Sequence, residues 1–189
     1  MVFINAVLIA ICQAWRAMKP RLFILLAALG LCAAPVCAQQ AVLAPDLSAR
    51  ILALHNLERE HIGAPTLDWD EALAQDAQGW AQSLVASGRF EHSPQVTRRN
   101  QGENLFMGTS GFYPIDAMIG SFLEERSDFR PGTFPAVSRS GNWHRVGHYT
   151  QLIWPQTRRI GCAIAQGRGD DVLVCRYWPA GNVMGEAVP

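Results

Sequence analysis

Histidine and glutamate, two residue types that often work together in binding and catalytic sites, are spread over the middle and second half of the chain. The candidates for a shared site are His92 in FEHS, Glu103 in GEN, Glu125, and His148 in GHYTQ. Imidazole nitrogens and carboxylate oxygens are accepted by zinc and other divalent metals, with water completing the coordination shell. These four side chains are therefore a suitable set for one site, with His92 and His148 as candidate metal ligands and the glutamates nearby.

The same groups also suit general acid–base catalysis, which needs no metal. The sequence has no HExxH motif and no paired CxxC motif, so spacing alone does not select a metal site. Ser93 beside His92 suggests a serine hydrolase, but adjacent residues rarely form a nucleophile–base pair and the GxSxG elbow is absent. Binding and hydrolysis both remain open on this evidence.

His148 stands at the start of a run of strand-forming residues. The alternation predicts a strand over residues 148–154, with His148, Thr150, Leu152 and Trp154 on one face and Tyr149, Gln151 and Ile153 on the other. A histidine at such a position is also often a core residue or the cap of a strand end. The pattern therefore leaves the role of His148 open.

Glu125 is expected to point inward from a helix that begins at Pro114 and ends near Phe129. The apolar stripe of this helix consists of Ile115, Met118, Phe122 and Phe129. Glu125 fills the gap in the stripe, whereas Glu124 points away from it. An inward carboxylate is costly unless it is paired or coordinates something, and an arginine partner or a position at the helix rim would also satisfy it.

Two further helices are predicted, over residues 45–63 and 70–88, with caps and stops at Asp46, Gly63, Asp70 and Gly88. The segments expected to lack regular structure are residues 89–111, 130–143 and 179–189. The other histidines are expected to be structural or solvated. His55 should pack within the first helix, His61 should be solvated at its end, and His144 should lie in a loop.

A β-hairpin is predicted over Arg159–Trp178, where two alternating runs flank the turn-forming stretch GRGD. A turn centred between Arg168 and Gly169 places Cys162 opposite Cys175, close enough for a disulfide bond. Two free buried thiols are the alternative. Helices followed by a hairpin-forming sheet predict an α+β domain.

The first 38 residues have the organisation of a secretory signal region. Starting at Met18, Lys19 and Arg21 precede an apolar run too short for a comfortable membrane span, and small residues precede a cleavage site after Ala38. We expect Met18 to be the true start and residues 39–189 to form one exported domain. A membrane-anchored form that keeps the apolar runs is the alternative.

The charge pattern argues against nucleic acid as a partner. The 189 residues carry 16 basic and 16 acidic side chains, and no basic run interleaved with aromatic residues occurs. Three basic residues precede the expected cleavage site, so the mature chain has a net charge of about −3.

Six segments resemble, in order, the successive signatures of the CAP superfamily, which includes cysteine-rich secretory proteins, antigen 5 and plant pathogenesis-related-1 proteins. These segments are HNLERE (55–60), LDWDEALAQDAQGWA (67–81), FEHS (90–93), QGENL (101–105), GHYTQLIWPQT (147–157) and VLVCRYWPAGNV (172–183). Together they cover nearly the whole expected mature chain. The compact domain and signal region are typical of a bacterial member.

The resemblance implies a three-layer α-β-α sandwich with a central antiparallel sheet. It also implies a large open cleft that holds two histidines and two glutamates and binds zinc in some members. His92, Glu103 and His148 match the family motifs directly. The second glutamate of the family lies three residues after one aromatic residue and four before another, which selects Glu125 over Glu124.

The resulting hypothesis is a secreted protein, extracellular or periplasmic, whose cleft binds a divalent metal, a lipid or a peptide without turnover. The alternative is a metal-dependent or acid–base hydrolase, similar to a peptidase, that uses the same four residues to activate water. A third hypothesis is an extracellular scaffold for protein contacts. We expect a monomer without a stable membrane span after cleavage.

Overall fold

The structure, a computed structural model, describes residues 45–189 except Arg168, with side chains from residue 47 onward. The signal region predicted over residues 1–38, the start at Met18, and the cap assigned to Asp46 lie outside what is described. No helix in the described part of the chain is both long enough and apolar enough to cross a bilayer.

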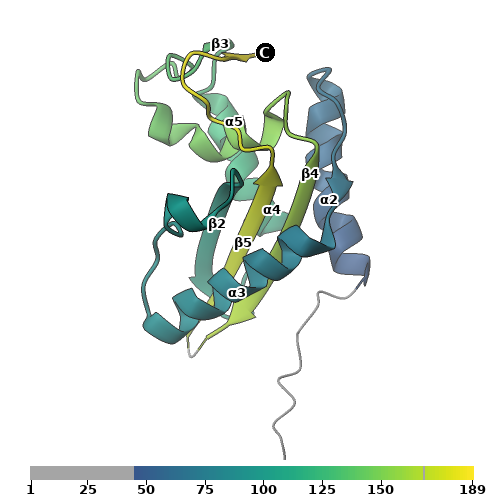
Figure 1. The fold of residues 1–189 in the computed structure, drawn as a ribbon, viewed down its shortest axis with the longest axis vertical. Helices are drawn as coiled ribbons and strands as arrows, with labels where there is room; N and C mark the ends of the chain where they lie inside the picture. Colours follow the sequence, from purple (N-terminus) through teal and green to yellow (C-terminus); the bar gives the residue numbers. More distant parts are fainter. Residues whose placement is uncertain (1–44, 168) are drawn as a thin grey trace, which may run out of the picture. The chain divides into compact units, whose positions relative to one another are not determined.

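The described residues form α-helices, 3₁₀ turns and β-strands (Figure 1). The α-helices are α2 (Pro45–His61), α3 (Glu71–Ser87), α4 (Ile115–Glu124) and α5 (Gly147–Ile153). The 3₁₀ turns are η1 (Gln95–Thr97), η2 (Glu125–Ser127) and η3 (Trp143–Arg145). The strands are β1 (Asp68–Trp69), β2 (Gly102–Thr109), β3 (Gly132–Thr133), β4 (Arg159–Gln166), β5 (Asp170–Trp178) and β6 (Ala187–Val188).

The main sheet has the strand order β1-β4-β5-β2 and lies between two helical layers (Figure 1). Helix α3 packs on one face of the sheet, whereas α2, α4 and α5 pack together on the other side. This confirms the three-layer α-β-α sandwich. Strands β2, β5 and β4 are antiparallel as predicted, but the short β1 runs parallel to β4, so the whole sheet is mixed.

The two layers are held by different kinds of core. Under α3 the core consists largely of alanine and valine, including Ala77 and Ala163, which lets the helix lie close to the sheet. Gly161 is required there, because a Cβ atom at this position would collide with the backbone at the start of α3. The opposite core contains larger side chains such as Phe122, Tyr149 and Trp154, which fill the wider space between the sheet and the three other helices.

Helix α3 and the hairpin follow the predictions closely. Asp70 caps α3 by accepting hydrogen bonds from the first free N–H groups, and Gly88 ends it in the left-handed conformation, with φ of 66°. In the hairpin, Cys162 lies directly opposite Cys175, and the two form a disulfide bond. The predicted register is therefore confirmed.

The strand predicted for residues 148–154 is wrong, because His148 belongs to helix α5. All residues from Tyr149 to Ile153 are buried in this helix, and over such a short, evenly buried run the periods of helix and strand cannot be told apart. The third predicted helix also ends earlier than expected. It stops at Glu124 and continues as the single 3₁₀ turn η2, which begins with Glu125.

Three segments predicted to be irregular contain strands. The longest of these strands is β2, which pairs with β5 along its whole length. The short strands β3 and β6 pair with each other. Two glycines within β2 weakened the sequence pattern by which a strand is predicted. Gly102 and Gly108 are needed because the side chains of Gln151 and Tyr113 occupy the space that a Cβ atom would fill.

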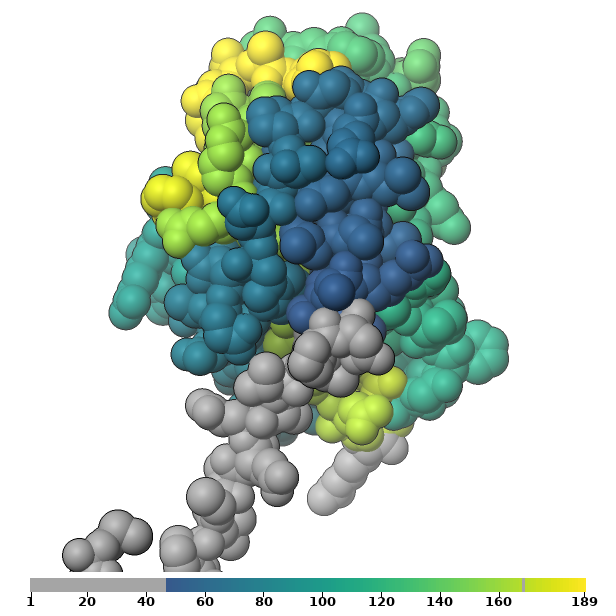
Figure 2. Space-filling view, turned by 90° about the vertical axis from the view of Figure 1, so that its right-hand side faces the viewer, coloured from purple at the N-terminus to yellow at the C-terminus, as the bar shows by residue number. Residues whose placement is uncertain are grey.

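Helix α2 forms much of the surface on one side of the molecule (Figure 2). Its inner side carries His55 and Arg59, which are completely buried. The expected packing role of His55 agrees with this position. His61 at the end of α2 and His144 in η3 are exposed, as expected for a solvated and a loop histidine.

Candidate functional site

His92 and Glu103 form the first of two histidine–glutamate pairs. The Nδ1 atom of His92 lies 2.7 Å from Oε1 of Glu103. The Glu103 side chain is fully buried, whereas the His92 side chain is 55% exposed. The buried carboxylate thus holds one ring nitrogen of His92, and the ring reaches solvent.

Glu103 is held by more than His92. Its carboxylate accepts hydrogen bonds from the backbone N–H of Ser93 at 2.9 Å and from the Ser93 hydroxyl at 2.8 Å, and it forms an ion pair with Arg176 at 3.0 Å. Burial raises the pKa of the Glu103 carboxyl, but the hydrogen bond from His92, the charge of Arg176 and the bonds from Ser93 outweigh burial and leave it below the ordinary value. Glu103 is therefore a fixed anion at neutral pH.

His148 and Glu125 form the second pair. The Nδ1 atom of His148 lies 2.6 Å from Oε1 of Glu125. The other carboxylate oxygen accepts hydrogen bonds from the backbone N–H groups of His148 and Tyr149, at 2.9 and 3.0 Å. These N–H groups belong to the first turn of α5 and have no partner within the helix. Glu125 consequently orients the imidazole and caps the helix that carries it.

The position of His148 is fixed further by an aromatic contact. Its ring stacks on Phe122 of α4, with centroids 5.0 Å apart and an angle of 22° between the planes. The side chains of His148 and Glu125 are 34% and 18% exposed, respectively. The prediction that Glu125 rather than Glu124 points inward agrees with this arrangement, because Glu124 is exposed.

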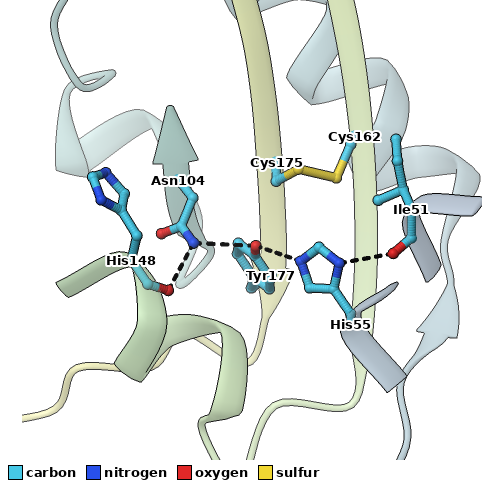
Figure 3. Close-up of a disulfide and its surroundings, with 7 residues drawn as sticks. All are labelled: Ile51, His55, Asn104, His148, Cys162, Cys175 and Tyr177. Atoms are coloured by element: carbon cyan, nitrogen blue, oxygen red, sulfur yellow. Dashed lines mark hydrogen bonds between the residues drawn. A yellow bond between two sulfur atoms is a disulfide. The ribbon is translucent and has the colours of Figure 1, made fainter. Parts of the chain in front are cut away.

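Strand β2 connects the two pairs. Glu103 belongs to the first pair, and the side-chain amide of the next residue, Asn104, donates a hydrogen bond of 2.9 Å to the main-chain oxygen of His148 (Figure 3). Neighbouring side chains on a strand point to opposite faces of the sheet. Glu103 accordingly lies on the α3 side with Arg176, whereas Asn104 lies on the side of α5.

A buried chain of hydrogen bonds continues from Asn104 to helix α2 (Figure 3). The amide of Asn104 donates to the Tyr177 oxygen at 3.2 Å, and this hydroxyl lies 2.9 Å from Nε2 of His55. Because the carbonyl of Ile51 can only accept, Nδ1 of His55 is the donor in their 2.8 Å contact. Tyr177 therefore donates to Nε2 of His55. Sequence reasoning missed Asn104 and Tyr177, although both lie within recognised family motifs.

Both histidines of the candidate site have the same orientation relative to their glutamates. Each uses Nδ1 toward a carboxylate, so Nε2 is left for a ligand. Ser93 is no candidate nucleophile, because it is buried and its hydroxyl donates to Glu103 rather than to a histidine. Between residues 45 and 189, leaving out Arg168, no group of three or more histidine, cysteine, aspartate or glutamate side chains is arranged to hold a metal ion.

Other parts of the molecule are separate from these pairs. His144 stacks on Trp143, with ring centroids 3.8 Å apart. A pocket of about 960 Å³ lies where the end of α3 meets the β4–β5 turn, lined by residues that include Leu84, Arg89 and Asp170. None of the four predicted site residues lines it.

Comparison with known proteins places these features in a family. The model of the cysteine-rich secretory protein family, CAP, matches residues 52–177. Pathogenesis-related protein 1C of Nicotiana tabacum is 31% identical over 137 residues, covering 72% of this chain and 77% of that protein. Glioma pathogenesis-related protein 1 of Mus musculus is 28% identical over 148 residues. It matches over 72% of this chain but only 54% of its own length, so the chain spans about half of that relative.

Solved structures agree with the sequence comparisons. The crystal structure of NaASP2 with Zn²⁺ superimposes with a TM-score of 0.66 at 25% identity, covering 77% of this chain and 85% of that one. The structure of BmVAL-1 gives a TM-score of 0.62 at 26% identity, covering 77% and 82%. The family model spans both histidine–glutamate pairs and the disulfide, and the chain belongs to the cysteine-rich secretory protein (CAP) family.

Proposed function

We propose that the chain is a secreted binding module, released to the extracellular or periplasmic space by cleavage near Ala38. The disulfide between Cys162 and Cys175 supports an oxidising compartment. The family model is that of a secretory family. We further propose that the mature protein is a monomer and that its partner is a small ligand, a lipid, a peptide or another protein.

The two histidine–glutamate pairs are the proposed binding site. The observation that carries this proposal is the shared orientation of the pairs, in which buried or half-buried carboxylates hold Nδ1 of His92 and His148. A carboxylate on one ring nitrogen fixes the tautomer and makes the other nitrogen a better metal ligand. Zinc or another divalent metal is the ligand that we propose for the Nε2 atoms of His92 and His148. The NaASP2 structure, which contains Zn²⁺, supports the same choice.

The pairs supply few ligands, and this limits the expected affinity. Both carboxylates already accept hydrogen bonds from histidine and from backbone N–H groups. The imidazoles of His92 and His148 would therefore hold the metal, with water in the remaining positions. We expect an exchangeable metal ion rather than a structural one.

Calorimetric titration of the purified protein with zinc near neutral pH tests the site. The double variant His92→Ala/His148→Ala should lose the heat of zinc binding, whereas His61→Ala should retain it, because His61 is an exposed histidine at the end of α2. Thermal unfolding of each variant checks that the fold is kept. Equal zinc affinity in the double variant and the wild type would refute the proposed metal site.

A hydrolase that uses the same residues is the alternative function. It is favoured by the Nδ1 contacts with Glu103 and Glu125, since an imidazole held in this way can act as a general base through Nε2. Water would have to be the nucleophile, because the Ser93 hydroxyl is bonded to Glu103. Peptide and ester hydrolysis by the wild type, lost in His148→Gln and kept in His61→Gln, would favour this alternative over binding alone.

A further inference from the structure

The outer edge of β2 is a feature that the metal proposal does not use. Because the strand order is β1-β4-β5-β2, β2 has a neighbouring strand on one side only. Every second residue of an edge strand directs its main-chain N–H and C=O groups away from the sheet. The registers of the sheet determine which residues of β2 do so.

The disulfide shows which residues of β4 and β5 exchange main-chain hydrogen bonds with each other and which direct these groups to the opposite side. The Cα atoms of Cys162 and Cys175 lie 4.1 Å apart, the short spacing of a pair that does not exchange main-chain hydrogen bonds. The carbonyl of Ile160 agrees with this pattern, since it bonds to the N–H of Asp70 on the side of β4 away from β5. The main-chain groups of Cys175 therefore face β2, where they meet Asn104.

It follows that Glu103, Leu105 and Met107 direct their main-chain groups outward. The turn after β2 confirms the pattern, because Thr109, two residues further along, uses its outward carbonyl to accept the N–H of Phe112. Within the described part of the chain, no backbone hydrogen bond from a turn or loop reaches the main-chain nitrogen or oxygen of Glu103, Leu105 or Met107. The main-chain groups at these three successive outward positions therefore have no hydrogen-bond partner among the described residues.

This edge is narrowly accessible at its start, where Glu103 and Leu105 are 6% and 5% exposed, and opens toward its end. The side chain of Glu103 is 0% exposed, yet the whole residue is 6% exposed, so its accessible surface belongs to the main chain. Further along the strand, Met107 is 44% exposed. Beyond the strand end, Phe112 is 71% exposed and contacts Tyr113, which in turn contacts Phe106. The edge therefore combines free main-chain groups with exposed apolar side chains.

We propose that an extended peptide segment of another molecule adds to the outer edge of β2 as a fifth strand of the main sheet. This inference rests on the proposed binding function and names the class of ligand. The unpaired N–H and C=O groups of Leu105 and Met107 complement a peptide backbone, and Met107 and Phe112 favour apolar side chains in the peptide. Pairing with a second copy through the same edge is an outcome that the measurements below distinguish.

Amide hydrogen exchange measured residue by residue tests the proposal. The probe is a synthetic peptide. It is first selected, from a displayed library of random short sequences, for binding to the disulfide-bonded protein in the presence of EDTA. Without peptide, the N–H groups of Leu105 and Met107 should exchange much faster than those of Asn104 and Phe106, which face β5. With peptide, the outward groups should become protected while the inward ones change little.

Matched variants give a second readout. Met107→Pro removes one outward donor without removing a ladder bond and should weaken peptide binding about tenfold, the effect of losing one hydrogen bond. Met107→Val keeps the donor and should bind as the wild type. If Met107→Pro fails to fold, the exchange pattern of the wild type still decides.

The proposal would be overturned if no peptide could be selected, or if a peptide bound without protecting the amides of Leu105 and Met107. It would also be overturned if these amides were protected without peptide, either in a dimer or in a monomer through the chain's own N-terminal segment. The metal site is tested independently, since the peptide measurements are made in EDTA and the zinc titration without peptide. Loss of zinc binding in His92→Ala/His148→Ala therefore leaves the peptide result unaffected.

Discussion

Glu125 holds His148 at two points, through the side-chain contact of 2.6 Å and through the backbone N–H at 2.9 Å. The two residues are far apart in sequence, and the second contact also caps helix α5. A short helix with no capping side chain at its own N-cap position, Val146, gains both an acceptor and a negative charge at its positive end. The candidate ligand-binding imidazole and the helix that carries it therefore depend on the same carboxylate.

The first prediction concerns this shared dependence. Glu125→Ala should lower the free energy of unfolding by about 1–3 kcal/mol, because it removes a helix cap and leaves half-buried donors without a partner. Chemical denaturation followed by circular dichroism measures the change. Glu124→Ala is the matched control. Its exposed side chain predicts a change within about 0.5 kcal/mol, and equal effects of the two variants would contradict the capping role.

The opposite end of α5 is also held by a distant residue. Arg59 of α2 is completely buried and donates from Nη1 to the carbonyl oxygens of Leu152 and Trp154, at 2.8 and 3.0 Å, and from Nη2 to Thr157 at 3.1 Å. Burial lowers the pKa of Arg59 to about 10, so the guanidinium stays charged at neutral pH. A positive charge at the carboxyl end of a helix complements its dipole.

The second prediction is that Arg59→Lys is strongly destabilising, by about 2–4 kcal/mol, although it conserves the charge. A single ammonium group cannot reach all the carbonyl groups that the planar guanidinium serves, and the remaining ones would be buried without donors. Equilibrium denaturation in urea measures the loss. Arg126→Lys is a suitable comparison, because Arg126 is 56% exposed in its ion pair with Glu58 and should change stability by less than about 1 kcal/mol.

These contacts explain why the sequence predicted some elements and missed others. Helix α3 carries its own cap, Asp70, and its own stop, Gly88, and the hairpin carries its turn and its opposed cysteines, so local patterns sufficed. Helix α5 is capped from α2 and η2, and nothing within its seven residues marks it as a helix. Its all-round burial removed the periodic signal that would have separated it from a strand.

The candidate site was predicted only in part for the same reason. The pairing of His92 with Glu103 and of His148 with Glu125 needs the fold to bring distant segments together, and residue types alone could not match each histidine to its glutamate. The family resemblance supplied the four positions, and the helix stripe independently selected Glu125. The buried link through Asn104 and Tyr177 lies between elements that no local pattern connects.

The third prediction concerns the disulfide. Cys162 and Cys175 are almost completely buried, and their bond closes a loop with a sequence separation of 13. For a loop of this size, reduction should lower the free energy of unfolding by about 3 kcal/mol. Alkylation of the unreduced, denatured protein followed by peptide mass spectrometry should leave both cysteines unlabelled. Labelling of either one would show free thiols and contradict the predicted stabilisation.

The last prediction is a dependence of stability on pH that comes from His55. Burial lowers the pKa of its imidazole to about 4, from an ordinary 6.5, and the nearby charge of Arg59 acts in the same direction. Between these two values the unfolded chain binds a proton that the folded chain does not, so stability falls as the pH decreases from 6.5 to about 4. The full shift corresponds to about 3 kcal/mol.

Urea denaturation at a series of pH values in this window, compared between wild type and His55→Gln, isolates the contribution. The variant removes the titrating group at the end of the hydrogen-bond chain from Tyr177, so its stability should vary less with pH even if its absolute stability is lower. His61→Gln, which changes an exposed histidine of the same helix, should keep the slope of the wild type. If the wild type and His55→Gln had parallel pH profiles, protonation in the unfolded state would not be linked to burial of His55.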